Sequence, residues 1–245
     1  MTKRLNLNEL VLPHLRSAKP YVPGEQPSGE GWIKLNTNEN PFPPSPHIAD
    51  AITEASKHLA IYPNPSSSEL RAVIGRLHGI DPANIVVGNG SDDILNLITR
   101  SFCSADSHGL LVEPGYSHYP VLIGLQGGVQ KEIRFDDAMK LPVGEIVNSQ
   151  TKVCFLTSPN APTGVGFSTK EIGKVLEAYQ GILVVDEAYA DFAKEDAISL
   201  LADFDNLIIT RTLSKSYALA GLRLGYAMAS VEVVNLLNAI RDPYN

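Results

Sequence analysis

The chain has 245 residues, of which 44% are hydrophobic and 19% are charged. These proportions are typical of a globular protein with a sizeable core. Twenty basic and 27 acidic residues give a net charge of −7. We therefore expect no basic surface for nucleic acid or for an anionic membrane.

The cysteines and the apolar runs indicate the compartment. The two cysteines, Cys103 and Cys154, are far apart and lack metal-ligand spacing, so reduced thiols are expected. No apolar run approaches the roughly 20 residues of a membrane-spanning helix. The N-terminus lacks the apolar core of a signal peptide. These features predict a soluble, cytoplasmic protein.

The expected elements follow one another in a regular order after a proline-rich start. Eight prolines among the first 46 residues predict an arm that is mostly extended and turning. Helices are expected at 47–59 and 67–77. The expected strands are 85–87, 109–112, 129–135, 153–156, 182–185, 207–209 and 224–228. The expected helices among them are 92–102, 118–125, 169–179 and 231–241. This alternation predicts an α/β fold in which helices cover both faces of a mostly parallel sheet.

One lysine is placed where such sheets bind ligands. Lys215 follows the expected strand at 207–209, and open α/β sheets bind ligands beyond the carboxyl ends of their strands. Small and hydroxyl side chains surround it. A partly buried lysine can lose its proton and act as an amine nucleophile, as Schiff-base chemistry requires. A solvated surface lysine is the alternative for any lysine considered alone.

An anion site is expected after the strand at 85–87. Two glycines in the run from Gly88 to Asp92 permit a tight turn, and the following helix would present free N–H groups. The run lacks the third glycine of a dinucleotide-binding motif. A purely structural turn with Ser91 as the helix N-cap fits the pattern about as well.

Three further strands are followed by residues suited to an aromatic ring. Tyr116 could stack on such a ring, although a structural aromatic residue is the alternative. Asn160 lies between two prolines, which stiffen the loop and suit an amide with a fixed hydrogen bond. Asp186 ends an apolar strand, where a carboxylate needs a cation such as a protonated pyridine nitrogen or a structural arginine. Together with Lys215 and the anion site, these residues describe a binding site for pyridoxal 5′-phosphate.

The motifs resemble those of the aspartate-aminotransferase superfamily, and most closely those of histidinol-phosphate aminotransferases. The resemblance extends from about Tyr21 to Asn245. Its most specific parts are Leu35-Asn36-Thr37-Asn38-Glu39-Asn40-Pro41, Tyr62-Pro63, Ser158-Pro159-Asn160-Ala161-Pro162-Thr163-Gly164, Val185-Asp186-Glu187-Ala188-Tyr189, and the segment from Ser214-Lys215 through Gly221-Leu222-Arg223.

The resemblance implies a role for each matching residue. Lys215 would form the Schiff base with the cofactor and later move a proton, and Asp186 would keep the pyridine nitrogen protonated. Tyr189 and Asn160 would bind the ring's phenolic oxygen, and Tyr116 would stack on the ring. The phosphate site would comprise the backbone amides of Ser91 and Asp92 with the side chains of Thr212, Ser214 and Arg223. Substrate contacts would come from Tyr21 and Asn38.

The resemblance also implies an assembly and a domain plan. Tyr62 would reach the cofactor phosphate of a neighbouring subunit in a homodimer with shared sites. Residues 1–46 would form an N-terminal arm and part of a small domain, and residues 47–245 would form the large domain that binds the cofactor. Family members continue for roughly another hundred residues. The small domain is therefore expected to be incomplete, with its C-terminal part absent from this chain.

The activity implied by the resemblance is transamination in histidine biosynthesis, with histidinol phosphate and 2-oxoglutarate as one amino-acid and keto-acid pair. Alternatives are a transaminase for aromatic amino acids, a pyridoxal-phosphate-dependent decarboxylase of a phosphorylated substrate, and a truncated remnant that binds the cofactor without catalysis. The six histidines have no metal-ligand spacing, so no metal site is expected. His118, the histidine nearest the expected site, is assigned to a helix surface.

Overall fold

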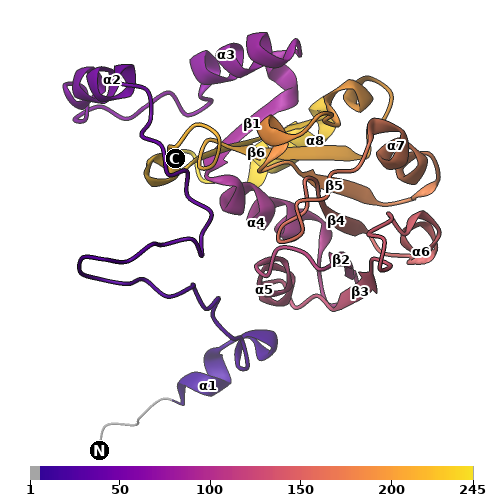
Figure 1. Cartoon of the computed structure of the whole chain (residues 1–245). Helices are drawn as coiled ribbons and strands as arrows, with labels where there is room; N and C mark the ends of the chain where they lie inside the picture. The colour runs from indigo at the N-terminus through magenta and orange to yellow at the C-terminus, as the bar shows by residue number, and fades with distance from the viewer. Residues whose placement is uncertain (1–5, 245) are drawn as a thin grey trace, which may run out of the picture.

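A computed structural model describes residues 6–244, and a seven-stranded sheet forms its centre (Figure 1). The order across the sheet is β1-β7-β6-β5-β4-β2-β3. Only β7 is antiparallel to its neighbours, β1 and β6, so the prediction of a mostly parallel sheet is confirmed. The strands are β1 (Ile85–Asn89), β2 (Gly109–Glu113), β3 (Gln130–Arg134), β4 (Val153–Thr157), β5 (Ile182–Asp186), β6 (Leu207–Thr212) and β7 (Leu224–Ala229).

Helices cover both faces of the sheet, as the alternation of elements predicts (Figure 1). One face carries α4 (Ser91–Phe102), α5 (Tyr119–Leu125) and α8 (Val231–Ile240). The other face carries α3 (Ser68–His78), α6 (Val143–Asn148) and α7 (Thr169–Ala178). Successive strand residues alternate between the two buried clusters because side chains on a strand point to opposite faces in turn. The site described below depends on this alternation.

Local sequence signals explain several of the element boundaries. Helix α7 begins at a capping box, in which Ser168 and Glu171 satisfy each other's backbone N–H groups. Helix α3 ends at Gly79, whose φ of 69° is the left-handed conformation that glycine adopts without strain. The predicted helix at 118–125 begins one residue later, because His118 is its N-cap residue.

The structure differs from the sequence-based prediction in one additional helix and in the length of one strand. Helix α6 was not predicted; it is one and a half turns long, too short for a clear apolar period. Strand β6 continues through Thr210, Arg211 and Thr212, three polar residues that are nevertheless buried. The apolar run stops at Ile209, so the hydrophobic pattern alone ends the strand too early. Thr210 and Thr212 face the functional site, whereas Arg211 points to the opposite face of the sheet.

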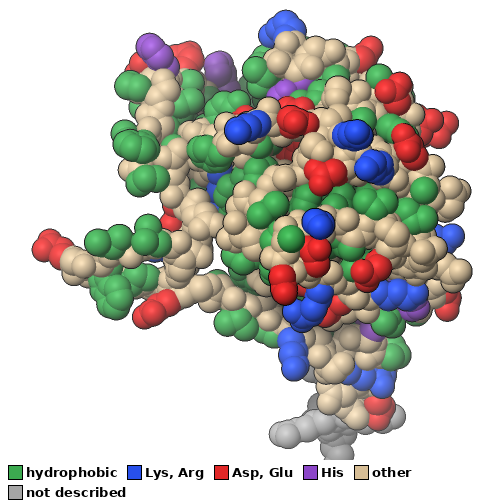
Figure 2. Space-filling view, turned by 45° about the vertical axis from the view of Figure 1, so that its right-hand side comes forward, with side chains coloured by type: hydrophobic (Ala, Val, Ile, Leu, Met, Phe, Trp, Pro, Cys, Tyr) green, Lys and Arg blue, Asp and Glu red, His purple; other side chains and the backbone are tan. Residues whose placement is uncertain are grey.

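The N-terminal arm projects from the body of the molecule (Figure 1). It contains the short helix α1 (Leu7–Leu10), a 3-10 turn (Pro13–Leu15) and an extended run that leads to α2 (His47–Ser56). Figure 2 shows hydrophobic side chains gathered on this projecting segment. The large apolar residues exposed on the arm include Val22, Trp32, Ile33, Leu35 and Phe42, and Leu59, Ile61 and Tyr62 are exposed just after α2. Single exposed apolar residues are common on monomeric proteins, whereas a group of large ones is typical of a surface that binds another protein.

Within residues 6–244, no helix is long and apolar enough to cross a lipid bilayer.

Candidate active site

A cavity of about 860 Å³ lies at the edge of the sheet where the parallel strands have their carboxyl ends. Parallel strands bring their carboxyl ends to one edge, so the loops after β1, β2, β4, β5 and β6 all reach it. Eleven of the thirteen predicted site residues line this cavity: Tyr21, Asn38, Ser91, Asp92, Tyr116, Asp186, Tyr189, Thr212, Ser214, Lys215 and Arg223. The other two, Asn160 and Tyr62, do not line it.

Lys215 lies three residues beyond the end of β6, as predicted, and its side chain is half-buried in the cavity. Its amine donates a hydrogen bond to the backbone carbonyl of Thr37, at 2.8 Å, and lies 5.8 Å from the centre of the Tyr189 ring. Burial lowers the pKa of Lys215 below the ordinary value for lysine. The neutral amine, which is the nucleophilic form, is therefore more accessible here than on the protein surface.

Asp186 is the last residue of β5 and is only 4% exposed. Tyr119 donates a hydrogen bond to one carboxylate oxygen at 2.7 Å, and Thr210 donates to the other at 3.1 Å. Burial raises the pKa of Asp186, while these hydrogen bonds act in the opposite direction. Among the described residues Asp186 forms no ion pair, so a structural salt bridge does not account for its burial.

The N-terminus of α4 opens toward the cavity because of two glycines. Gly90 is the N-cap residue, with φ at 79°, and a β-carbon there would lie 2.4 Å from the guanidinium of Arg223. A β-carbon on Gly225 would lie 2.2 Å from the backbone nitrogen of Ser91. Both positions thus need glycine for β7 and Arg223 to approach the start of the helix. The alternative with Ser91 as N-cap is wrong, since Gly90 occupies that position.

The start of α4 combines helix-end N–H groups with a cationic side chain. Arg223 lies 3.6 Å from the Asp92 carboxylate, and both side chains are nearly half exposed, so this pair is weak. Arg223 itself has φ at 56°, a left-handed conformation that costs a non-glycine residue of order 1 kcal/mol. Its guanidinium is available to an anion bound at the helix terminus.

The N-terminal arm forms one wall of the cavity and is hydrogen-bonded to Tyr189 and to the loop that carries Lys215. Asn38 donates to the hydroxyl of Tyr189 at 2.9 Å. Asn40 donates to the backbone carbonyls of Lys215 and Ser216, at 3.1 and 3.2 Å. The hydroxyl of Thr37 is buried beside them without a partner among the described residues. The arm therefore fixes the loop that carries Lys215.

Tyr116 lies on the cavity wall formed by the loop before α5, and His118 lies beside it at the start of that helix. The Tyr116 hydroxyl donates to Asp92 at 3.2 Å, and its pKa is raised by burial. The His118 ring lies 5.1 Å from that of Tyr21 and 5.9 Å from that of Tyr116, and its Nδ1 is buried. His118, assigned to a helix surface, is the N-cap residue of α5 and is half-buried beside these aromatic rings.

Asn160 and Tyr62 lie outside the cavity wall. Asn160 is 2% exposed; its amide nitrogen donates to the carbonyl of Pro114 at 2.8 Å, and its amide oxygen accepts from Thr163. The stiff loop that the sequence predicts is thus tied to the loop after β2. Tyr62 is 78% exposed and stacks on Tyr244, with 4.5 Å between ring centres.

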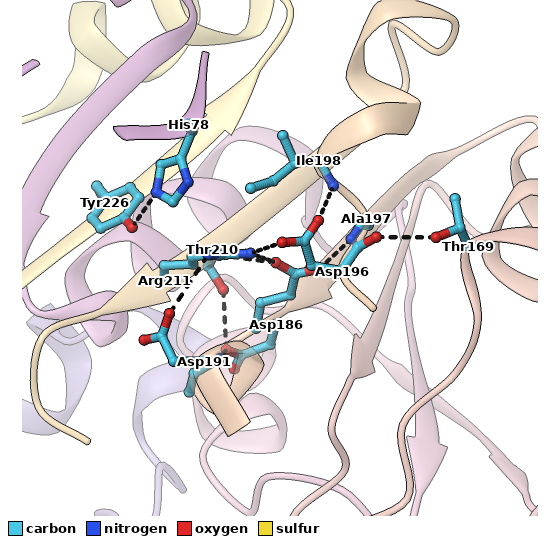
Figure 3. A network of polar contacts seen from close by, with 12 residues as sticks. His78, Thr169, Asp186, Asp191, Asp196, Ala197, Ile198, Thr210, Arg211 and Tyr226 are labelled. Carbon is cyan, nitrogen blue, oxygen red and sulfur yellow. Dashed lines mark hydrogen bonds and ion pairs between the residues drawn. The ribbon is translucent and has the colours of Figure 1, made fainter. Parts of the chain in front are cut away.

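An ion network centred on the buried pair of Arg211 and Glu187 lies on the opposite face of β5 and β6. Arg211 donates to Glu187 at 2.7 Å and to Asp196 at 2.8 Å, and it lies 3.9 Å from Asp191 (Figure 3). Burial alone would lower the pKa of Arg211, but the adjacent carboxylates raise it overall. Asp191 also accepts a hydrogen bond from Ser216, next to Lys215. The network thus holds the segments after β5 and β6 together.

The sequence alone did not point to the residues around Asp186 or to the partners of Arg211. Thr157, Thr210 and Tyr119 are polar groups inside apolar runs or at a helix start, so each by itself looks structural. A usable signal was present in the strands. Thr157 and Asp186 both occupy the last position of a strand, where a polar residue after four apolar ones faces the sheet edge. Register then aligns Asp186 with both Thr157 and Thr210.

Comparison with known proteins identifies relatives of the whole described fold. The model of the family "Aminotransferase class I and II" matches residues 30–245. The histidinol-phosphate aminotransferase of Geobacter sulfurreducens is 45% identical over 230 residues, which cover 92% of this chain and 65% of the relative. That of Synechocystis is 38% identical over 235 residues, covering 96% of this chain and 67% of the relative. The chain thus spans about two thirds of the length of the curated relatives that it matches.

Solved structures show the same architecture. The crystal structure of histidinol-phosphate aminotransferase from Sinorhizobium meliloti, in complex with pyridoxal-5′-phosphate, superposes with a TM-score of 0.79 at 28% identity. The match covers 84% of this chain and 59% of that protein. The L-threonine-O-3-phosphate decarboxylase of Porphyromonas gingivalis superposes with a TM-score of 0.71 at 24% identity, which indicates a shared fold. From the match to residues 30–245 and the level of identity to its relatives, the chain belongs to the class I and II aminotransferase family.

Proposed function

We propose that this chain carries the cofactor site of a pyridoxal-phosphate-dependent aminotransferase that converts histidinol phosphate and 2-oxoglutarate, in either direction, within histidine biosynthesis. The observation that carries the proposal is the cavity at the sheet edge, where Lys215, Asp186 and the start of α4 come together. Relatives 38–45% identical are named histidinol-phosphate aminotransferases, which supports this substrate.

The donor set of the cavity fits pyridoxal phosphate in each of its chemical parts. A half-buried amine with a lowered pKa suits the aldehyde, and a buried carboxylate without a cation suits a protonated ring nitrogen. The helix terminus and Arg223 suit a phosphate. Residues proposed to hold the phosphate are Ser91, Asp92, Thr212, Ser214 and Arg223; those proposed to contact the ring are Tyr116, Tyr189, Asp186 and Lys215. Asn160 remains a predicted partner of the phenolic oxygen.

When bound, pyridoxal phosphate supplies an electron sink that stabilises negative charge at the substrate's α-carbon. The protein's own residues perform the remaining tasks. Lys215, as a neutral amine, would take the proton from the substrate's α-carbon and would return it at the former aldehyde carbon of the cofactor. Asp186 maintains positive charge on the ring nitrogen, and Tyr189 positions the ring from the side of its phenolic oxygen. Tyr21 and Asn38, on the arm, are proposed to contact the substrate.

The first experiment incubates the cofactor-loaded chain with histidinol phosphate and 2-oxoglutarate and measures glutamate. We expect glutamate to form in equal amount to the keto product of histidinol phosphate, because transamination couples the two. Aromatic amino acids serve as competing donors in the same assay. Faster turnover of an aromatic donor would contradict the substrate assignment. Histidinol phosphate has no carboxyl group, so the decarboxylase alternative is tested separately with L-threonine-O-3-phosphate as substrate. Release of carbon dioxide from that substrate without glutamate would indicate a decarboxylase, and cofactor uptake without any product would indicate a remnant.

We also propose that two copies of the chain share their sites. The arm exposes large apolar side chains, among them Trp32, Ile33 and Phe42, which a second copy would cover. Tyr62 is exposed and lies outside the cavity of its own subunit, as a residue that serves the neighbouring site would. A cytoplasmic location is proposed as well, because Cys103 and Cys154 are buried and unpaired.

Mixing two inactive variants tests the shared site. Lys215→Ala and Tyr62→Ala are each expected to lose activity, whereas chains of both kinds, unfolded and refolded together, regain about a quarter of the wild-type activity. This value follows because half of the randomly formed pairs contain one intact site out of two. Lys215→Ala mixed with Asp186→Asn is the control, since both residues then belong to the same site and no activity returns. Equal results from the two mixtures would contradict the shared site.

A further inference from the structure

Tyr119 occupies an unusual position for a core aromatic residue. It lies in the first turn of α5, is 1% exposed, and stacks on Phe155 with 4.9 Å between ring centres. Its hydroxyl reaches two partners inside the core, the Asp186 carboxylate at 2.7 Å and the Thr157 hydroxyl at 2.8 Å. A phenol has one proton to donate. The contact with an ionised carboxylate uses it, so Thr157 must donate to Tyr119.

The second carboxylate oxygen of Asp186 also accepts hydrogen bonds. Thr210 donates to it at 3.1 Å (Figure 3). The backbone N–H of Ala188 donates to the same oxygen at 3.3 Å. Strand register places Thr157 and Thr210 on either side of Asp186, so the three side chains emerge on the face covered by α4 and α5. Three donors, the hydroxyls of Tyr119 and Thr210 and the backbone N–H of Ala188, lie within hydrogen-bond distance of the carboxylate and stabilise its charged form. A protonated Asp186 would have to donate its own proton to Tyr119 or Thr210, and it would lose that partner's stabilising donation.

We infer that Tyr119 is a positioning residue for Asp186: through the relay Thr157–Tyr119–Asp186, with Thr210 on the other oxygen, it holds the carboxylate ionised and aimed into the cavity. The inference rests on the proposed function, in which this carboxylate faces a protonated ring nitrogen. Without such donors, a buried carboxylate would lower its cost by taking up a proton itself. The ring nitrogen would then carry less positive charge.

Other charged groups also act on Asp186. Asp92, at the start of α4, opposes its ionisation, while Lys215, from the loop after β6, interacts with it favourably. Tyr116, on the loop before α5, stands edge-on to Tyr119 at 5.5 Å. None of these three donates a hydrogen bond to Asp186. Removal of the Tyr119 hydroxyl therefore changes the carboxylate directly and leaves the surrounding charges in place.

Tyr119→Phe is the primary test, because phenylalanine keeps the ring stacked on Phe155 and removes only the hydroxyl. The measurement is the visible absorption of pyridoxal phosphate bound to the chain, titrated against pH. We expect the midpoint to rise by about one pH unit, the scale of one hydrogen bond to a charged group. The midpoint rises because a less positive ring nitrogen withdraws less electron density from the carbon–nitrogen bond that joins Lys215 to the cofactor. The nitrogen of that bond then holds its proton up to a higher pH.

Tyr179→Phe is the matched control. Tyr179 is also buried, at 2% exposure, and bonds to Thr151 at 2.8 Å at the opposite edge of the sheet. Its removal costs a comparable buried hydrogen bond without touching Asp186, so the midpoint should stay at the wild-type value. Thr210→Val, which removes the donor to the other oxygen, should shift the midpoint upward as well. If Tyr119→Phe does not fold, Thr210→Val replaces it as the test variant.

The outcomes separate this inference from the proposed function. A wild-type chain that takes up no pyridoxal phosphate overturns the proposed function, whatever Tyr119 does. A wild-type chain that binds and titrates, with both variants at the same midpoint, overturns the role of Tyr119 alone. A shift in Tyr179→Phe equal to that in Tyr119→Phe would also overturn it, since the effect would then be one of general stability.

Discussion

Replacing Lys215 by alanine should lower the rate of transamination by about 10³-fold or more, because the variant loses both the nucleophile and the group that moves the α-proton. The amine is well placed for both tasks. It lies in the cavity, 2.8 Å from the Thr37 carbonyl, and burial lowers its pKa. The measurement is glutamate formation under saturating cofactor and substrate.

Two further variants separate nucleophilic chemistry from charge. Lys215→Arg keeps a positive charge but remains protonated at any working pH, so it should be as inactive as Lys215→Ala. Lys152→Ala removes an exposed lysine that borders a different cavity, at the far edge of the sheet, and should have wild-type activity. Activity in Lys215→Arg within tenfold of wild type would show that Lys215 acts only through its charge.

Replacing Asp186 by asparagine should slow transamination by about 10²-fold or more, the usual cost of deleting a preorganised electrostatic group. Asparagine fits the same space and keeps a hydrogen-bond acceptor for Thr210 or Tyr119. It cannot balance a positive ring nitrogen. A reduction of less than about tenfold in turnover would indicate that Asp186 has a structural role.

The same variant should be more stable than the wild type when the cofactor is absent. Burial raises the pKa of Asp186, so the folded chain binds more protons than the unfolded chain between the two pKa values. The stability contributed by this group is therefore lost as the pH rises through the folded-state pKa. Asparagine has no charge to bury and avoids this loss. We therefore expect the free energy of unfolding at pH 7 to be about 1 kcal/mol or more higher for Asp186→Asn than for the wild type.

Unfolding by urea, at pH 7 and again at acidic pH, measures this effect. The advantage of Asp186→Asn should shrink as the pH falls and the wild-type carboxylate becomes protonated. Asp137→Asn, in an exposed loop, is the control and should change the unfolding free energy little at either pH. A cofactor-free Asp186→Asn chain that is less stable than the wild type at pH 7 would contradict the account. A functional site that costs stability is a common compromise.

The sheet and most of its helices could be predicted from the sequence because their residues follow a simple period. The run from Ile182 to Val185 is apolar and short, as a strand buried on both faces must be, and Asp186 stands out at its end. Lys215 was predictable for a similar reason, since it follows an apolar strand. These are local signals, and the fold brings them to one sheet edge by the general rule for parallel strands.

Contacts between distant segments could not be predicted in the same way. The bond between Lys215 and Thr37 joins residues 178 positions apart, and that between Tyr119 and Asp186 spans 67 positions. Hydrophobic period does not encode such pairs. Arg211 was missed because it interrupts the end of an apolar strand and looks like a loop residue, although Glu187 and Asp196 compensate its burial.

The central claim is that Lys215 and Asp186 act on one bound molecule of pyridoxal phosphate. The most direct measurement loads the chain with the cofactor, fixes it by borohydride reduction, and locates the added mass by peptide mapping. We predict a pyridoxyl group on Lys215 alone, in wild type and in Asp186→Asn, with the visible absorption before reduction altered in the variant. A group attached to another lysine, or an absorption that the Asp186 substitution leaves unchanged, would contradict the claim.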